Sequence, residues 1–255
     1  MSTQDGGHRA EAVEALAERD YAAAGDRYSR AGWRVLADPR PGVEPFEPDE
    51  KGWIGAGLGY LALSGVCYRV AGAKDRAARR GVEGVAVSRD LAAGFEHPVQ
   101  RACLAEFVAD FRAIGDVGDA AAAYEDAADA YREATIDDRG PQYWGTTPLF
   151  EAATGLIQQV ARSLANGEIA VEWGDLHGSD PADPGAFLAA RPIYKRQRFP
   201  GLLERVTDEG FLAAPRGTTE YATDHHRCPD CGSTDVNWTA ESTLCLRCSR
   251  PAEPQ

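Results

Sequence analysis

The 255-residue chain is poor in lysine and in basic charge. Lys51, Lys74 and Lys195 are its only lysines, and 27 basic residues stand against 40 acidic ones, giving a formal net charge of −13. A phosphate backbone attracts basic surfaces, so binding of nucleic acid through bulk charge is disfavoured. Hydrophobic residues make up 44% of the chain, which disfavours disorder throughout. The length suits one large domain or two small ones.

The chain also lacks the short motifs that mark common catalytic sites. It has no glycine-rich phosphate loop with a lysine, no nucleophile elbow and no helical histidine pair. His177, near Asp175 and Asp180, could act as a base, but no nucleophile motif accompanies it. We expect this histidine to be solvated, and we expect the protein not to be an enzyme.

Long hydrophobic runs are missing as well. The first 20 residues lack the apolar core of a secretory signal. Residues 52–68 carry no charge, but a membrane-spanning helix needs about 20 predominantly apolar residues. This run is shorter, and small residues dilute it: Gly55, Gly57, Gly59, Ser64 and Gly65. We expect a helix buried on all sides within a helical array, in a soluble, cytoplasmic protein.

The excess of carboxylates has its own interpretation. A net charge far from zero keeps chains apart, and proteins that stay soluble in molar salt carry such an excess. Arginine is favoured over lysine, and alanine is abundant. We therefore hypothesise that the protein is halophilic. The alternative is an ordinary acidic cytoplasmic protein.

Helical periodicity dominates the first 212 residues. We expect two helices before Pro39, then helices over residues 52–68, 74–93, 97–116, 118–134 and 149–165, and further helices over 185–212 that are interrupted near Pro200. Gly81 and Gly84 weaken the helix over 74–93. We expect loops over 38–50, 137–148 and 166–184, a short strand over 169–173 within the last of these, and a linker over 214–220.

Two helical segments share one spacing. Tyr21, Ala24, Tyr28 and Ala31 are matched by Tyr124, Ala127, Tyr131 and Ala134, and the second segment begins about three 34-residue periods after the first. The spacing resembles the second helix of a tetratricopeptide repeat, in which a small residue allows close helix approach and aromatic residues fill the groove between hairpins. The remaining helices depart from that consensus, so the chain is more similar to irregular SNAP-like αα-superhelices. The alternative is an unrelated helical bundle.

Four cysteines near the end of the sequence form a metal-ligand pattern. Cys228 and Cys231 are followed, after thirteen residues, by Cys245 and Cys248, and this pattern resembles a zinc ribbon. The stretches 235–238 and 242–246 would form its hairpin. Four protein ligands leave no open position, so the resemblance implies one structural Zn²⁺ per chain. Iron in a rubredoxin-like site and two disulfides are the alternatives.

Other polar and aromatic residues near this pattern have simpler expected roles. We expect His225 and His226 to be exposed, because four cysteines already complete the coordination shell. Trp238 is expected to fill the core of the ribbon. Cys67 and Cys103 lie in apolar helical surroundings, and free cysteine is commonly buried.

The sequence thus predicts a mainly α protein: an αα-hairpin superhelix similar to tetratricopeptide and SNAP-like folds over residues 1–214, then a linker and a small β zinc ribbon over 215–255. We expect a non-catalytic scaffold or adaptor that binds a protein partner. The candidate contacts are two aromatic residues and the start of a basic stretch that extends to Arg205: Tyr143, Trp144, Arg191, Lys195, Arg196 and Arg198. The alternative for this basic stretch is a solvated helical face whose arginines and lysine pair with neighbouring carboxylates.

Two other functions remain open. A nucleic-acid-associated accessory factor of the ribosome or the transcription machinery would use the ribbon and the basic stretch between Arg191 and Arg205. The third hypothesis is an enzyme with an unrecognised site.

Overall fold

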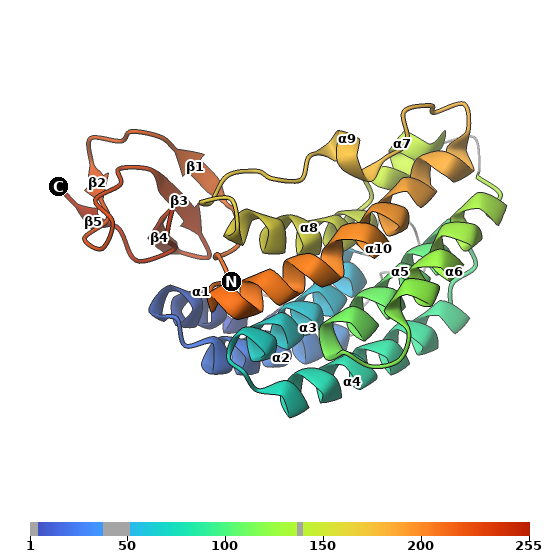
Figure 1. The fold of residues 1–255 in the computed structure, drawn as a ribbon, viewed down its shortest axis with the longest axis horizontal. Helices are drawn as coiled ribbons and strands as arrows, with labels where there is room; N and C mark the ends of the chain where they lie inside the picture. Colours follow the sequence, from blue (N-terminus) through green and yellow to red (C-terminus); the bar gives the residue numbers. More distant parts are fainter. Residues whose placement is uncertain (1–4, 38–51, 137–139) are drawn as a thin grey trace.

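Helices make up most of the part of the chain that the structure describes, which comprises residues 5–37, 52–136 and 140–255 (Figure 1). The structure is a computed structural model. A small antiparallel sheet region follows the helices, so the predicted mainly α class is confirmed. The loop expected over residues 38–50 lies outside the described residues.

Except for α7 and α9, which fall in expected loops, the helices begin and end close to the predicted bounds. They are α1 (His8–Glu18), α2 (Tyr21–Ala37), α3 (Gly52–Val70), α4 (Lys74–Ala93), α5 (Pro98–Gly115), α6 (Ala120–Glu133), α7 (Gly140–Gly145), α8 (Pro148–Ser163), α9 (Trp173–Leu176) and α10 (Pro184–Glu209). Local chemistry sets several starts. The Asp119 and Asp183 carboxylates accept hydrogen bonds from the first turns of α6 and α10, and proline stands in the first turn of α5, α8 and α10.

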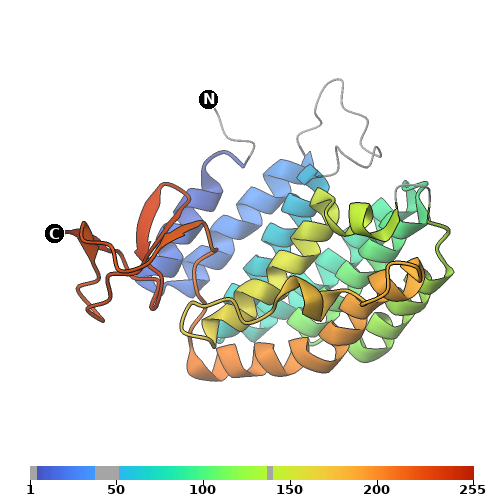
Figure 2. The same cartoon turned by 90° about the horizontal axis from the view of Figure 1, so that it is seen from above.

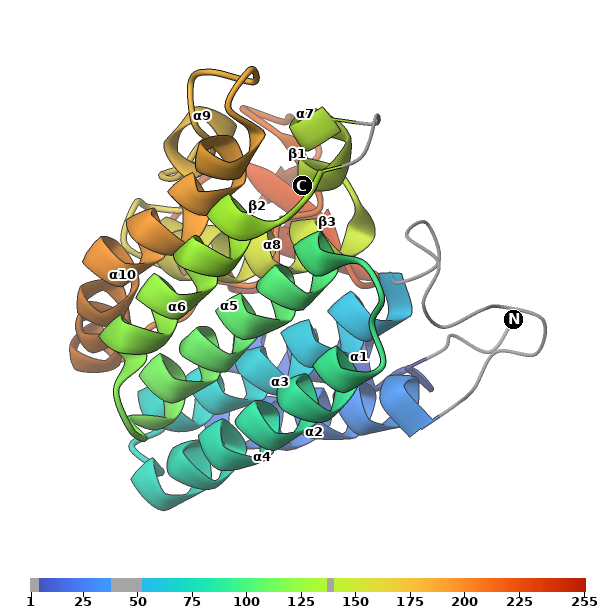
Figure 3. The ribbon, with the colours of Figure 1, turned by 90° about the vertical axis from the view of Figure 1, so that its right-hand side faces the viewer.

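Helix α3 is the centre of the helical body. It packs against α2, α4 and α8, and most of its residues are buried, as predicted for an uncharged helix (Figure 3). Among the described residues, no helix is long and apolar enough to cross a membrane.

Glycines on α4 allow a close approach to α5. A Cβ at Gly81 would lie 2.7 Å from the Gly115 Cα, and one at Gly84 would lie 2.1 Å from the Phe111 ring. The two glycines lower the helix propensity of α4, as expected, but they also permit the packing that holds this helix in place.

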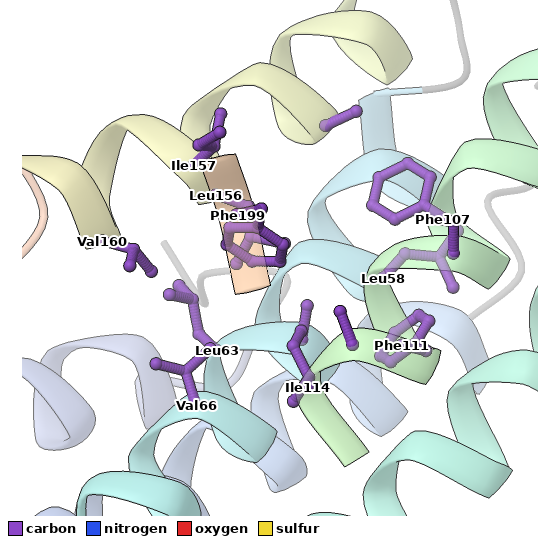
Figure 4. Packing of buried hydrophobic residues seen from close by; sticks show 14 of the residues in the cluster. Leu58, Leu63, Val66, Phe107, Phe111, Ile114, Leu156, Ile157, Val160 and Phe199 are labelled. Carbon is purple, nitrogen blue, oxygen red and sulfur yellow. The ribbon is translucent and has the colours of Figure 1, made fainter. Parts of the chain in front are cut away.

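Helices far apart in the sequence complete the core. Helix α8 packs on α3, and α10 packs on α6 and α8. Figure 4 shows the resulting cluster, to which α3 contributes Leu58, α5 Phe107, α8 Ile157 and α10 Phe199. The tyrosines of both matched segments, Tyr21, Tyr28, Tyr124 and Tyr131, are buried.

Four local predictions are wrong. Helix α10 runs unbroken through Pro192 and Pro200, because its packing on α6 and α8 outweighs the missing N–H groups. The stretch 169–173 forms no strand, and α9 begins at its end. Helix α7 lies within the expected loop over 137–148. The expected linker contains a strand, β1 (Thr218–Glu220), because the sheet offers this segment a partner.

The predicted hairpin is confirmed. Strands β3 (Val236–Thr239) and β4 (Ser242–Cys245) pair antiparallel, and β1 pairs with the other edge of β3. The hairpin turns through Ala240 and Glu241, which both have positive φ, as a two-residue turn between twisted strands requires. A second pair joins β2 (His226–Arg227) to β5 (Glu253–Pro254).

Candidate metal centre and buried ionic cluster

Two similar turns present the four cysteines. In the first, the Gly232 N–H donates to the Cys228 carbonyl oxygen at 2.9 Å; in the second, the Ser249 N–H donates to the Cys245 carbonyl oxygen at 2.9 Å. Gly232 and Ser249 occupy the same position of the turn, with φ of 74° and 58°. Each Cys-x-x-Cys pair therefore curls so that both of its thiols face one point.

The sulfur atoms are spaced for one ion. The Sγ atoms of Cys228 and Cys248 lie 3.5 Å apart, as do those of Cys231 and Cys245, and the four lie within 4.8 Å of one another. Metal–sulfur bonds of about 2.3 Å in a tetrahedron place sulfur atoms about 3.8 Å apart. A disulfide needs about 2.05 Å, and all four cysteines are free. The donor set fits a metal ion and does not fit the disulfide alternative.

The proximity of the thiols changes their proton affinities. A hydrogen bond from the Cys248 thiol lowers the pKa of Cys245 to about 5. The cluster thus favours at least one thiolate, and thiolates are the form that binds a metal. Four sulfur ligands would fill the coordination shell of the bound ion, so no coordination position would remain for a substrate.

The second turn has Ser249 where the first has Gly232. A non-glycine residue at φ 58° is strained, but the Ser249 Oγ accepts a hydrogen bond from the Ala214 N–H at 3.0 Å. The serine hydroxyl therefore connects the cysteine turn to the segment that leaves α10.

The cysteine region is built into the helical body. Arg250 Nη1 donates to the Ala17 carbonyl oxygen at the end of α1 at 3.1 Å, and Arg247 bridges Asp235 within the sheet region and Glu168 after α8. A small apolar cluster joins Val13 and Ala17 of α1 to Leu244 of β4. Figure 2 shows the sheet region lying beside the first helices at one end of the molecule.

The residues beside the cysteines occupy varied positions. His225 is exposed, as expected, whereas His226 is half-buried, with its ring edge-on to Trp238 at 6.2 Å. Trp238 is itself only half-buried. The metal-ligand cluster found among the described residues contains the four cysteines and neither histidine.

A second constellation lies in the helical core. Glu106 and Asp110 of α5 face Arg191 and Lys195 of α10, and all four side chains are buried. Lys195 Nζ lies 2.8 Å from Glu106 Oε1 and 2.7 Å from Asp110 Oδ2. Arg191 Nε donates to Glu106 Oε1 at 2.8 Å and Arg191 Nη2 to Glu106 Oε2 at 2.8 Å. We call these four residues the ionic cluster.

Tyrosines of α6 complete the ionic cluster. The Tyr124 hydroxyl donates to Asp110 at 2.6 Å, and the Tyr131 hydroxyl to Glu106 at 3.2 Å. Burial raises the pKa of Glu106, but Arg191 and Lys195 outweigh it and lower the value to about 2. Burial also raises the pKa of Asp110, to about 6, despite the opposing charge of Lys195. The four charged side chains thus join α5 to α10, and the two tyrosines add α6 to the same network.

Three of the predicted partner contacts lie in the interior. Trp144, Arg191 and Lys195 are buried, so these residues are corrected from surface contacts to core residues, because the carboxylates of α5 compensate the two cations. Among the others, Arg196 is exposed and pairs with Glu125 at 3.1 Å. Arg198 is exposed, and Tyr143 is half-buried.

His177 is not solvated. Its ring stacks on Trp173 with centroids 3.6 Å apart and contacts Phe187, and burial lowers its pKa. The expectation failed because α9 and the start of α10 enclose the residue. Cys67 and Cys103 are both buried, as predicted, and burial raises the pKa of both thiols.

The sequence contained a signal for the ionic cluster. Glu106 and Asp110 are four residues apart on the apolar side of α5, and Arg191 and Lys195 are four residues apart in α10. Acidic residues at i and i+4 share one helical face, and so do basic ones. Two such faces of opposite charge can pair, and this complementarity was missed.

Comparisons with protein-family models, curated proteins and solved structures gave no match for this chain.

Proposed function

We propose that the protein is a non-catalytic interaction scaffold, in which a repeat-like helical body and a ribbon held by one structural Zn²⁺ form a single surface for a protein partner. The observation that carries the proposal is a set of exposed apolar side chains on the segment from α8 to α9 and just after β1. We call Ile169, Trp173 and Tyr221 the junction surface. Exposed apolar patches on soluble proteins commonly mark interaction sites.

The junction surface is supported by hydrogen bonds between the two parts. Ile169 follows Glu168, whose Oε2 accepts a hydrogen bond from the Tyr221 hydroxyl at 3.0 Å. Ile169 is 57% exposed, Tyr221 48% and Trp173 44%. A partner that covers them would contact the segment after α8 and the ribbon together.

The distribution of ionisable groups supports a non-catalytic role. The ionic cluster joins two carboxylates and two cations, and its members are 0–1% exposed. Substrate cannot reach these groups without opening the core. The four thiols, with Zn²⁺ bound, would leave no position for a substrate.

The repeat-like character rests on the matched segments. Tyr21, Ala24 and Tyr28 of α2 are buried at the spacing of Tyr124, Ala127 and Tyr131 in α6, as expected for second helices of tetratricopeptide-like hairpins. Helices α2 to α6 also pack in sequence order, which is typical of stacked hairpins.

The alternative, a nucleic-acid-associated factor, retains less support. Its basic stretch loses Arg191 and Lys195 to the ionic cluster, and Arg205 lies 3.8 Å from the Glu209 carboxylate. The ribbon remains its main argument.

Affinity purification from native cells in molar KCl tests the scaffold. We expect one protein to co-purify with the wild type and to be lost from a variant carrying Ile169→Ser and Trp173→Ser. Val82→Ser is the matched control, because Val82 on α4 is also 57% exposed. A complex that nuclease treatment dissolves would favour the nucleic-acid alternative, and the absence of any specific partner would contradict the scaffold.

A further inference from the structure

A groove of about 410 Å³ lies between α3 and α8, beside the segment that leads into β1. Its walls are mainly apolar and include Leu63 of α3, Leu156 of α8 and Val171. Figure 4 shows Leu63 and Leu156 extending from the two neighbouring helices. The volume lies within the range of small-molecule sites, which are typically apolar with a few polar groups.

Two glycines widen this groove without serving helix packing. Gly59 of α3 and Gly155 of α8 both line it, and a Cβ at either position would meet nothing within 4 Å. Gly55 differs, because its Cβ would lie 3.0 Å from the Ala152 Cβ. A glycine inside a helix lowers helix stability relative to alanine. Gly59 and Gly155 therefore have a cost that packing does not explain, and their effect is to leave open volume.

Two guanidinium groups line the same groove. Arg162 is only 4% exposed, and within the described chain its guanidinium makes one hydrogen bond, from Nη2 to the Ala214 carbonyl oxygen. Arg216 donates to three neutral oxygens, those of Gly167, Thr219 and Tyr221. Within the described residues, neither arginine has a carboxylate at ion-pair distance.

The two positive charges oppose each other. Burial and then the charge of Arg216 lower the pKa of Arg162 to about 10. Glu168 is close to Arg216 through the Tyr221 hydroxyl, but its carboxylate is engaged by Arg247 and Tyr221. A buried charge is costly unless it is paired. In a chain with 40 acidic residues, a groove with two unpaired guanidinium groups is complementary to an anion that comes from outside the described residues.

We propose that this groove binds an aliphatic carboxylate, with the alkyl chain in the space beside Gly59 and Gly155 and the carboxylate on Arg162 and Arg216. Such a ligand needs apolar walls and a cationic group, and the groove offers both. A peptide backbone would also need free hydrogen-bonding groups. The side-chain amides of Gln158 and Gln159, which line the groove, already donate to the carbonyl oxygens of Val171 and Ala213. The site borders the junction surface, because Ile169 also lines the groove, but the proposal does not require a protein partner.

Calorimetric titration with octanoate tests the head group. The titration uses the full chain, in the salt that keeps it folded, and ligand below its micelle concentration. We expect one octanoate per chain and at least tenfold weaker binding of 1-octanol, which keeps the alkyl chain and lacks the charge. Arg216→Gln should weaken octanoate binding at least tenfold and leave 1-octanol unaffected. Equal affinity for the two ligands, or no binding of octanoate, overturns the proposal.

A glycine variant tests the open volume. Gly155→Leu should fill the groove and abolish octanoate binding without lowering the thermal unfolding temperature, because leucine favours the helix and its Cβ would meet nothing within 4 Å. Gly201→Leu is the matched control: Gly201 is an exposed glycine of α10, and its Cβ would also meet nothing within 4 Å. This control should bind octanoate as the wild type does. Unchanged binding in Gly155→Leu would place the ligand elsewhere and overturn the assignment.

Discussion

Arg191 is held by several groups of the helical core at once. Its guanidinium donates to Glu106 and Tyr131, and to the Phe150 carbonyl oxygen at 3.1 Å. The ring of Phe150 also lies under it, 4.5 Å from centroid to Cζ. Burying an ion pair gains little over an apolar pair, but removing one partner leaves an uncompensated charge. Each member of the ionic cluster is therefore needed to compensate the buried charge of the others.

Glu106→Gln should be strongly destabilising. The substitution keeps the shape of the side chain but leaves Arg191 and Lys195 with one buried carboxylate between them. We expect the free energy of unfolding to fall by about 3–5 kcal/mol, measured by urea denaturation in KCl. Glu125→Gln is the matched control, since Glu125 is exposed and pairs with Arg196; it should cost no more than about 1 kcal/mol. Equal effects of the two substitutions would contradict the role of the cluster.

The same residue should contribute to acid unfolding. The pKa of Glu106 is about 2 in the folded protein, below the ordinary value of 4.5. A lowered folded-state pKa contributes stability that is fully present above pH 4.5 and is lost as pH falls toward 2. The difference in unfolding free energy between the wild type and Glu106→Gln should therefore shrink over that window. A constant difference would show that Glu106 does not titrate with this shift.

At the scale of the elements, periodicity predicted the helices that carry an apolar face, and cysteine spacing predicted the candidate site. Two of the failures have a common cause, because each depends on a distant partner. α10 continues through two prolines because α6 and α8 hold it, and β1 forms because β3 offers an edge. Ser249 is similar: its positive φ is explained by the Ala214 N–H, which is 35 positions away. Local sequence cannot show such contacts.

Glycines on α4 provide a test of helix packing. Gly81→Ala should destabilise the protein by about 1–3 kcal/mol, because the new Cβ would lie 2.7 Å from the Gly115 backbone and overpacking is costly. Helix propensity alone predicts the opposite, a gain of up to about 1 kcal/mol. Gly201→Ala, at an open position of α10, should show that gain. Thermal denaturation of both variants decides between the two effects, and stabilisation by Gly81→Ala would contradict the packing.

At the scale of the whole molecule, the cysteine region and the helical body should depend on each other. Binding of structural Zn²⁺ supplies about 10–16 kcal/mol to small zinc domains, and here the cysteine region also covers Val13 and Ala17 of α1. We expect one Zn²⁺ per chain by elemental analysis. Chelation, or Cys245→Ser, should release the ion, unfold the sheet and increase hydrogen exchange in α1.

Two comparisons make the zinc experiment specific. Helix α4 packs on α3 and α5, so its exchange should stay unchanged after chelation. Cys67→Ala removes a buried cysteine outside the metal site and should retain the ion. Finding iron in place of zinc would change the identity of the metal but not the assignment of the site. Loss of zinc without any change in α1 would show that the two parts are energetically separate.

The net charge of −13 connects stability to salt. Repulsion among carboxylates destabilises the compact state, and the Debye length shortens to about 3 Å at 1 M salt. If the protein is halophilic, its unfolding temperature should rise steadily between 0.1 and 3 M KCl.

A variant with four exposed acids neutralised (Glu14→Gln, Glu18→Gln, Glu204→Gln and Asp208→Asn) should reach the same stability at lower KCl, because it carries less repulsion to screen. Salt also strengthens apolar burial, which would raise both curves equally. The horizontal offset between the two curves therefore isolates the charge effect. Curves without an offset would contradict the halophilic hypothesis and indicate an ordinary acidic protein.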